Sequence, residues 1–246
     1  MKITIENTYE EISREAVKDL LQILQRVENP LLCTASGDSP RGLYKELIKQ
    51  VKENDIDISA WTFLSLDEWL GMNEEDEGSC RFHLNNDLFN PLNVDESKII
   101  FFDGRAADPM KECSRIEKFI EDFGGIDLAI VGLGMNGHVG MNEPGTSSSS
   151  RIHIAEIDST TQTVGQKYFK SNQQLTHGLT LGVYSILEAR TIMLIVSGTK
   201  KASIVREVLE MEISEARPAS FLHNHENFFV YLDSAAASQL KQKSDG

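Results

Sequence analysis

The sequence predicts an α/β fold in which a mostly parallel β-sheet is covered by helices on both faces. Short apolar runs alternate with longer segments of helical period, as strands and helices do when they follow each other along a chain. Two runs, residues 127–132 and 191–196, are almost wholly apolar, which is typical of parallel strands buried on both sides. At 246 residues, the chain suits one undivided α/β domain spanning residues 1–246.

The N-terminal elements follow from apolar spacing and from residues that begin or end helices. The run MKITI at 1–5 predicts a strand, and residues 30–33 predict a second one. Residues 34–39 form a small-residue turn, and Pro40 is expected to open the next helix. Between the strands, a helix over 9–27 is predicted because five apolar side chains share one face: Ile12, Val17, Leu20, Leu21 and Leu24.

The remaining elements alternate in the same way. Further strands are predicted at 61–66 and 99–102, and helices at 109–123 and 200–211. The tail 234–246 is predicted to begin as a helix. These elements complete the α/β pattern.

One low-complexity segment, GTSSSSR at 145–151, directly follows the most motif-like part of the chain. Such a segment is typical of a mobile loop beside a functional site. Four consecutive serines are equally typical of a solvated linker. Composition alone leaves both readings open.

Charge and cysteine content exclude several classes of function. The net charge of −14 argues against a nucleic-acid or anionic-membrane surface, so any phosphate must be bound locally. Cys33, Cys80 and Cys113 are odd in number and lack CxxC spacing, which predicts reduced thiols and a cytoplasmic protein. We find no signal peptide and no run approaching the ~20 apolar residues that cross a bilayer.

The first motif is TASGDSP at 34–40, where a strand leads through a small-residue turn into a helix. The free N–H groups and the dipole at a helix start favour an anion, so a phosphate fits there. The patterns GxxxxGK[ST] and GxGxxG are absent, and a nucleotide is therefore not indicated. We expect Asp38 to point outward, because a carboxylate facing the ligand would repel it.

The second motif is WTFLSLDEWLG at 61–71, in which a strand ends in two adjacent carboxylates. Ligands of parallel sheets bind at the carboxyl ends of strands, where Asp67 or Glu68 would serve as a base. Successive strand side chains diverge, so only one of the two is expected to face a site. The alternative is a helix-capping Asp67 beside a solvated Glu68.

The third motif is the strongest, and it runs from Asp127 to Gly145 as DLAIVGLGMNGHVGMNEPG. A buried strand enters a loop with five glycines, which allow a ligand to approach the backbone closely. His138 and Glu143 in this loop indicate general acid–base chemistry. Zinc is not expected, because further His or Cys ligands at suitable spacing are missing nearby.

The fourth motif is VSGTKKAS at 196–203, where a strand ends and a helix begins. Lys200 and Lys201 are candidate partners for a phosphate in this acidic protein. The alternative is a pair of solvated lysines, which adjacent lysines commonly form.

With these four segments in this order, the chain resembles the family of glucosamine-6-phosphate deaminases and galactosamine-6-phosphate isomerases, which is related to 6-phosphogluconolactonase. The resemblance spans nearly the whole length. TASGDSPRGLYKEL resembles the phosphate turn and helix, SLDEWLG the catalytic strand end, and GLGMNGHVGMNEPG the signature loop. The NEP triplet after the GH pair favours the amino-sugar enzymes over the lactonases. The resemblance implies a modified Rossmann-like fold and a mechanism without metal or cofactor.

The resemblance also implies roles for individual residues. Asp67 would move a proton from C2 to C1 of an open-chain 2-amino-2-deoxyhexose 6-phosphate, giving a ketose imine that water hydrolyses to ammonia. His138 would open the pyranose ring, and Glu143 would orient and tune it. The implied substrate-binding positions are Ser36, Gly37, Asp38, Ser39, Gly137, Lys167 and Lys201.

Two positions depart from the pattern of the glucosamine enzymes. Asn136, which we include in the catalytic set, stands where they usually carry Asp, and it cannot influence His138 by charge. Lys167 stands about where their phosphate-binding Arg would be, and it lacks the bidentate fork of Arg. LDEW together with NGHVGMNEPG favours the galactosamine branch, with tagatose 6-phosphate and ammonia as products; glucosamine 6-phosphate is the next candidate.

Two other functions compete with this interpretation. A 6-phosphogluconolactonase-type hydrolase shares the fold and the GH-containing loop, but the NEPG sequence argues against it. A non-catalytic sugar-phosphate sensor is the second alternative, because effector domains of some bacterial repressors share this fold. Those repressors carry an N-terminal DNA-binding unit, for which the segment before residue 30 is too short. The sequence leaves open whether the chain forms a homo-oligomer.

Overall fold

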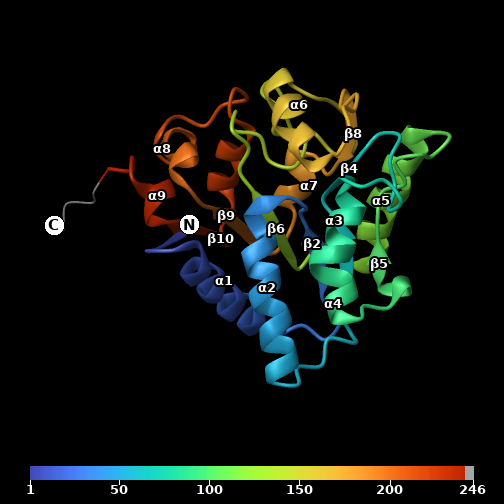
Figure 1. Cartoon of the computed structure of the whole chain (residues 1–246), viewed down its shortest axis with the longest axis horizontal. Coiled ribbons are helices and arrows are strands. Elements are labelled where there is room, and N and C mark those ends of the chain that lie inside the picture. The colour runs from blue at the N-terminus through green and yellow to red at the C-terminus, as the bar shows by residue number, and fades with distance from the viewer. Residues whose placement is uncertain (242–246) are drawn as a thin grey trace.

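The computed structural model describes residues 1–241 and places a parallel sheet of seven strands at the centre of the molecule (Figure 1). Every pair of neighbouring strands in it is parallel. In spatial order the strands are β1 (Lys2–Glu6), β10 (Phe228–Asp233), β9 (Ile192–Val196), β6 (Leu128–Gly132), β2 (Leu31–Thr34), β3 (Thr62–Ser65) and β5 (Ile99–Ile100). The predicted mostly parallel, Rossmann-like sheet is confirmed.

Side chains of the central strands alternate between two apolar cores, one on each face. In β6, Leu128 and Ile130 belong to one core, and Ala129 and Val131 belong to the other. Each core is completed by its own helices, as the prediction of helices on both faces requires. The first contains α1 (Tyr9–Leu24) and α2 (Asp38–Glu53), side by side in Figure 1; the second contains α5 (Pro109–Phe123), α7 (Val183–Leu187) and α8 (Ala202–Glu210).

The predicted helices are confirmed, with small shifts at their ends. The helix predicted over 9–27 starts at Tyr9 behind a capping box, in which Thr8 and Glu11 bind each other's backbone N–H groups, and ends at Leu24. The helix expected to open at Pro40 begins two residues earlier, at Asp38. Proline is tolerated throughout the first turn, because N–H groups there have no partner within the helix.

A second sheet was not predicted. It consists of three short antiparallel strands, in the order β4 (Asp67–Trp69), β8 (His177–Thr180) and β7 (His153–Glu156). The strand predicted over 61–66 therefore ends at Ser65, and Asp67 begins a new strand. Figure 1 shows β4 and β8 near α6 (Ser159–Gly165), which is followed by the short 3₁₀ helix η3 (Gln166–Tyr168).

Several short helices also escaped prediction. A continuous helical segment contains α3 (Cys80–Leu84), a π-helical turn η1 (Asn85–Phe89) and α4 (Asn90–Leu92). Three further 3₁₀ segments are η2 (Glu96–Lys98), η4 (Thr199–Lys201) and η5 (Pro218–Asn224). The tail does begin as a helix, α9 (Ser234–Ala237), and its last five residues, 242–246, lie outside the described residues.

The remaining expectations concern the serine-rich segment, the thiols and membranes. Residues 145–151 form a loop, and none of them lines the cavity described below. Gly145 N–H donates to the carbonyl of Glu215, and Tyr184 N–H donates to the carbonyl of Ser150. All three cysteines are free and buried, which confirms the predicted thiols. Within residues 1–241, no helix is both long and apolar enough to cross a membrane.

Candidate active site

A cavity of about 1110 Å³ lies at the carboxyl ends of four adjacent strands. Residues that directly follow β2, β3, β6 and β9 line it, as expected for ligand binding to a parallel sheet. Eight of the eleven predicted site residues line this cavity: Ser36, Gly37, Asp38, Ser39, Asp67, His138, Lys167 and Lys201. Residues that are distant in the sequence therefore meet in this cavity; Ser36 and Lys201, for example, are 165 positions apart.

The two adjacent carboxylates after β3 divide as predicted, since only Asp67 faces the cavity. Burial raises the pKa of Asp67 to about 6, although a hydrogen bond from Cys80 and the charge of His138 act in the opposite direction. Glu68 is fully buried and accepts hydrogen bonds from the backbone N–H groups of Trp69, Cys80 and Arg81. The alternative of a capping Asp67 and a solvated Glu68 is thus wrong: Glu68 is the residue that binds the start of α3.

The imidazole of His138 lies against the backbone of the glycine-rich loop. A Cβ atom at position 134 would come within 2.4 Å of the ring, so only Gly134 permits this approach. Nδ1 lies 3.0 Å from Thr161 Oγ1 and 3.4 Å from Glu143 Oε2. Within residues 1–241, Nε2 has no hydrogen-bond partner, and the ring lines the cavity.

Behind the imidazole, Asn136 and Glu143 form a polar layer that does not line the cavity. Asn136 Nδ2 donates to Glu143 Oε2 at 2.7 Å and to Asp158 Oδ1 at 3.3 Å, and Asn136 Oδ1 accepts from the backbone of His138 at 3.2 Å. Burial opposes ionisation of Glu143, but contacts with His138, Thr161 and Asn136 outweigh it, and the pKa of Glu143 is lowered. This layer holds an ionised carboxylate beside the imidazole.

Gly137, predicted to bind substrate, does not line the cavity. Its N–H donates to Gly134, and its carbonyl accepts from Ala219. A Cβ atom at this position would lie 3.1 Å from the side chain of Arg217. Gly137 therefore shapes the loop that presents His138, and its contact with the substrate stays a prediction.

Another group of lining residues, the turn from Ser36 to Ser39, suits an anion. The turn after β2 leads into α2, whose N-cap Gly37 has φ = +92°, a conformation that favours glycine. Asp38 N–H donates to the Tyr168 hydroxyl at 3.3 Å and Pro40 has no N–H, so the start of α2 offers an anion the N–H group of Ser39 and the helix dipole. Lys201 is partly buried here and donates to the carbonyl of Leu133; burial and the nearby Lys167 lower its pKa to about 8. Lys200 is exposed, so only Lys201 of the two adjacent lysines is partly buried.

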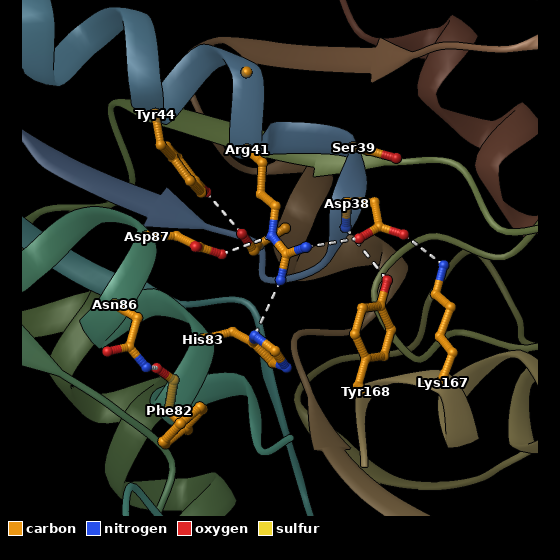
Figure 2. A network of polar contacts seen from close by, with 12 residues as sticks. Asp38, Ser39, Arg41, Tyr44, Phe82, His83, Asn86, Asp87, Lys167 and Tyr168 are labelled. Atoms are coloured by element: carbon orange, nitrogen blue, oxygen red, sulfur yellow. Dashed lines mark hydrogen bonds and ion pairs between the residues drawn. The ribbon is translucent and has the colours of Figure 1, made fainter. Parts of the chain in front are cut away.

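Asp38 does not point outward as expected, and Figure 2 shows its carboxylate facing Lys167 and Tyr168. Asp38 Oδ2 lies 2.5 Å from Lys167 Nζ, and Oδ1 lies 3.0 Å from Arg41. Arg41 also contacts Asp87 at 2.9 Å and His83 at 3.2 Å. Burial opposes ionisation of Asp38, but its cationic neighbours outweigh burial and lower its pKa. These favourable partners explain why the side chain turns toward the cavity.

Several residues of the site carry no signal in the sequence. Cys80, His83, Thr161 and Tyr168 all line the cavity. They belong to α3, α6 and η3, short elements whose positions are set by contacts with distant strands and not by apolar periodicity. Within residues 1–241, no group of three or more His, Cys, Asp or Glu side chains is arranged to hold a metal ion.

Comparison with known proteins identifies relatives along the whole chain. Residues 4–230 match the model of a family described as glucosamine-6-phosphate isomerases/6-phosphogluconolactonase. A glucosamine-6-phosphate deaminase of Clostridium tetani (strain Massachusetts / E88) is 38% identical over 238 residues, covering 96% of this chain and 99% of the relative. Glucosamine-6-phosphate deaminase 1 of Bacillus subtilis (strain 168) is 35% identical over 239 residues, covering 97% and 99%.

Solved structures agree with these relationships. A monomeric glucosamine-6-phosphate deaminase superposes with a TM-score of 0.94 at 35% identity, covering 97% of this chain and all of that one. The 6-phosphogluconolactonase of Trypanosoma brucei shares the fold, with a TM-score of 0.77 at 18% identity and 98% of each chain covered. The sequence match and the fold lead to one conclusion: the chain belongs to the glucosamine-6-phosphate isomerase/6-phosphogluconolactonase family.

Proposed function

We propose that this protein isomerises and deaminates a 2-amino-2-deoxyhexose 6-phosphate without a cofactor, releasing a ketohexose 6-phosphate and ammonia. The observation that carries the proposal is the shared cavity: Asp67 and His138 line it together with the anion-binding turn and Lys201. Relatives named glucosamine-6-phosphate deaminase support an amino-sugar phosphate as the substrate class. The overall reaction consumes one water for each ammonia released.

Asp67 is the proposed base for the isomerisation. With a pKa of about 6 it is mostly ionised at pH 7, yet it is more basic than a solvated carboxylate. It removes the proton at C2 of the open-chain amino aldehyde and returns it at C1, while a second proton passes from the amino nitrogen to O1; the product is a ketose imine. Water then adds to C2 and ammonia departs. A single carboxylate can serve both carbons because they are neighbours in the sugar.

His138 is the proposed acid–base group for opening the pyranose ring. Its Nδ1 is held by Thr161 and by Glu143, which leaves Nε2 to exchange a proton with the sugar. Asn136 holds Glu143 in place through its amide N–H group. Asn136 and Glu143 are thus proposed to act through the imidazole, as positioning residues behind it.

The 6-phosphate is proposed to bind at the start of α2. The turn from Ser36 to Ser39 supplies N–H groups and hydroxyls, and Lys201, which lines the same cavity, supplies a charge. Lys167 would join them, but it is paired with Asp38 in this structure. Phosphate binding therefore requires Lys167 to be shared between Asp38 and the ligand.

Galactosamine 6-phosphate is the proposed preferred substrate, with tagatose 6-phosphate as the ketose product, and glucosamine 6-phosphate is the second choice. The preference rests on the combination of LDEW at 66–69 with NGHVGMNEPG at 136–145. Asn136 adds to it, since the glucosamine enzymes usually carry Asp there. The two substrates are epimers at C4. The residues proposed to bind the phosphate and to transfer protons are proposed to act on either of them.

The decisive experiment incubates the purified chain with each of the two amino-sugar phosphates and measures ammonia and ketose phosphate. Release of both products at equal rates supports the proposed reaction, and the ratio of kcat/KM values decides between the epimers. Ammonia from neither substrate overturns the proposal. In that case, hydrolysis of 6-phosphogluconolactone and calorimetric binding of the sugar phosphates separate a lactonase from a sensor.

A further inference from the structure

The carboxylate of Asp67 has a specific neighbour that the reaction does not consume, the thiol of Cys80. Cys80 Sγ lies 3.4 Å from Asp67 Oδ1, within hydrogen-bond distance for sulfur. Within residues 1–241, no other side chain is hydrogen-bonded to this carboxylate. Cys80 is 4% exposed and lines the same cavity. The thiol is therefore placed to influence both the orientation and the protonation of Asp67.

The thiol must be the donor in this contact. Burial raises the pKa of Cys80 well above its usual range, and the negative charges of Asp67 and Glu68 raise it further. Cys80 thus keeps its proton, and the S–H group can only point that proton at an acceptor. A protonated, buried thiol is also a poor nucleophile, which argues against covalent chemistry at this position.

The backbone of Cys80 is fixed by the second carboxylate of the pair. Glu68 accepts the N–H groups of Cys80 and Arg81, each at 2.9 Å. Ser79 caps the same helix by accepting the N–H group of Phe82 at 3.0 Å. Asp67 and Glu68 are therefore both tied to the start of α3, Glu68 through the backbone and Asp67 through the thiol. This arrangement gives the buried Glu68 a role in placing Cys80.

We propose that Cys80 is a positioning residue for Asp67, whose S–H group holds the carboxylate toward the cavity and favours its ionised form. The inference builds on the proposed function, in which Asp67 must be ionised to remove the C2 proton. A hydrogen bond to an ionised group is stronger than one to a neutral group, so the thiol stabilises the carboxylate preferentially. Loss of the donor would make the carboxylate harder to ionise and freer to rotate.

The kinetic test compares Cys80→Ala and Cys80→Ser with the control Cys113→Ala, which removes a buried thiol from α5, away from the cavity. We expect Cys80→Ala to lower kcat about tenfold with little change in KM, and to move the acidic limb of the pH–rate curve upward by about one unit. Cys80→Ser keeps a donor and should retain most of the activity. Cys113→Ala should leave kcat, KM and the pH–rate curve unchanged.

A second measurement needs no turnover, so it separates this proposal from the proposed function. The side-chain carboxyl carbon of Asp67 is followed by ¹³C NMR during a pH titration and assigned with Asp67→Asn. The midpoint should rise in Cys80→Ala and in the nearly isosteric Cys80→Val, but not in Cys113→Ala. A raised midpoint in a protein that releases no ammonia supports the role of Cys80 and counts against the deaminase alone.

The proposal is overturned if the midpoint of Asp67 stays unchanged in a Cys80 variant that lacks a donor. Thermal unfolding identifies which variants are folded, and Cys80→Val serves if the cavity left by alanine prevents folding. Equal loss of kcat in Cys80→Ser and Cys80→Ala, with no movement of either pH–rate curve, would also contradict it, because packing alone would explain that result.

Discussion

Two aspartates line the cavity, Asp67 and Asp38, and they differ in burial, in partners and in the direction of their pKa shifts. Asp67 is 9% exposed, and within residues 1–241 its carboxylate is hydrogen-bonded to one thiol. The side chain of Asp38 is 54% exposed, and it is paired with Lys167 and Arg41. Burial raises the pKa of Asp67, whereas cationic partners overcome burial and lower that of Asp38. The same residue type thus suits proton transfer at position 67 and a permanent charge at position 38.

The comparison suggests how this fold separates chemistry from binding. A buried group with few partners can change its protonation state near neutral pH, because neither state is strongly held. A solvated ion-pair network keeps its charge over a wide pH range and can exchange partners at small cost, since exposed pairs contribute little each. Substitutions of Asp67 should therefore change kcat, and substitutions of Asp38 should change KM.

The largest expected effect is that of Asp67→Asn. The amide cannot accept the C2 proton, so kcat should fall by roughly 10³-fold or more, while binding of the sugar phosphate persists in calorimetry. Stability should not fall, because the substitution removes a buried charge that has only a weak donor. Substantial turnover by this variant would refute the proton-transfer role.

The adjacent Glu68 provides the matched control. Glu68→Gln replaces an acceptor of three backbone N–H bonds, and one end of the amide cannot accept them. Its main effect should be a loss of about 1–3 kcal/mol in the free energy of unfolding, measured by urea denaturation. A smaller loss of kcat should accompany it, because Glu68 also holds the backbone of Cys80. A loss of kcat as large as that of Asp67→Asn, at full stability, would remove the distinction between the two carboxylates.

The pH dependence of kcat/KM should report on two groups of the cavity, Asp67 and Lys201. As pH rises through about 6, Asp67 ionises and kcat/KM should increase; as pH rises through about 8, Lys201 loses its proton and phosphate binding should weaken. One unit below the lower midpoint, the rate should be about tenfold down. Lys201→Arg keeps its charge, so the basic limb should move to higher pH. An unmoved basic limb would exclude Lys201 as its source.

A smaller effect, several-fold, is expected from Asn136→Asp. The new carboxylate would lie beside Glu143 and Asp158 and would lose the N–H donor that now joins them. Repulsion should raise the pKa of Glu143 and move the pH–rate curve. Adding Asp158→Asn should partly reverse the change, which a double-mutant cycle measures. A curve that stays in place would show that the amide of Asn136 has no part in the reaction.

The smallest predicted effect concerns Asp38, which lies in the proposed phosphate-binding turn. Asp38→Ser releases Lys167 and removes a negative charge from the cavity, so KM for the sugar phosphate should fall about two- to threefold with kcat unchanged. Asp87→Asn is the control, because Asp87 also binds Arg41 but does not contact Lys167. Raised KM in Asp38→Ser would show that the carboxylate assists binding.

The sequence determined the α/β class, six of the seven strands of the parallel sheet and the long helices on both faces, whereas β10 was not predicted. Strands such as β6 and β9 are apolar enough to be predicted from composition, and local residues such as Thr8 and Glu11 cap α1. The strand-end position pointed to Asp67 or Glu68, and the resemblance to a known family selected Asp67; His138 was singled out together with Glu143 in the glycine-rich loop after a strand. These features depend on local patterns, which a sequence displays directly.

Only the tertiary structure decided what surrounds those residues. Three features depend on contacts between residues that lie from more than a dozen to over a hundred positions apart in the sequence. They are the antiparallel sheet containing β4, the short helices that bring Cys80 and Thr161 to the site, and the orientation of Asp38 toward Lys167. The role of Gly137 in shaping the loop is likewise visible only in the structure. Partner choice and burial set each pKa and orientation, and both arise only when distant segments pack together.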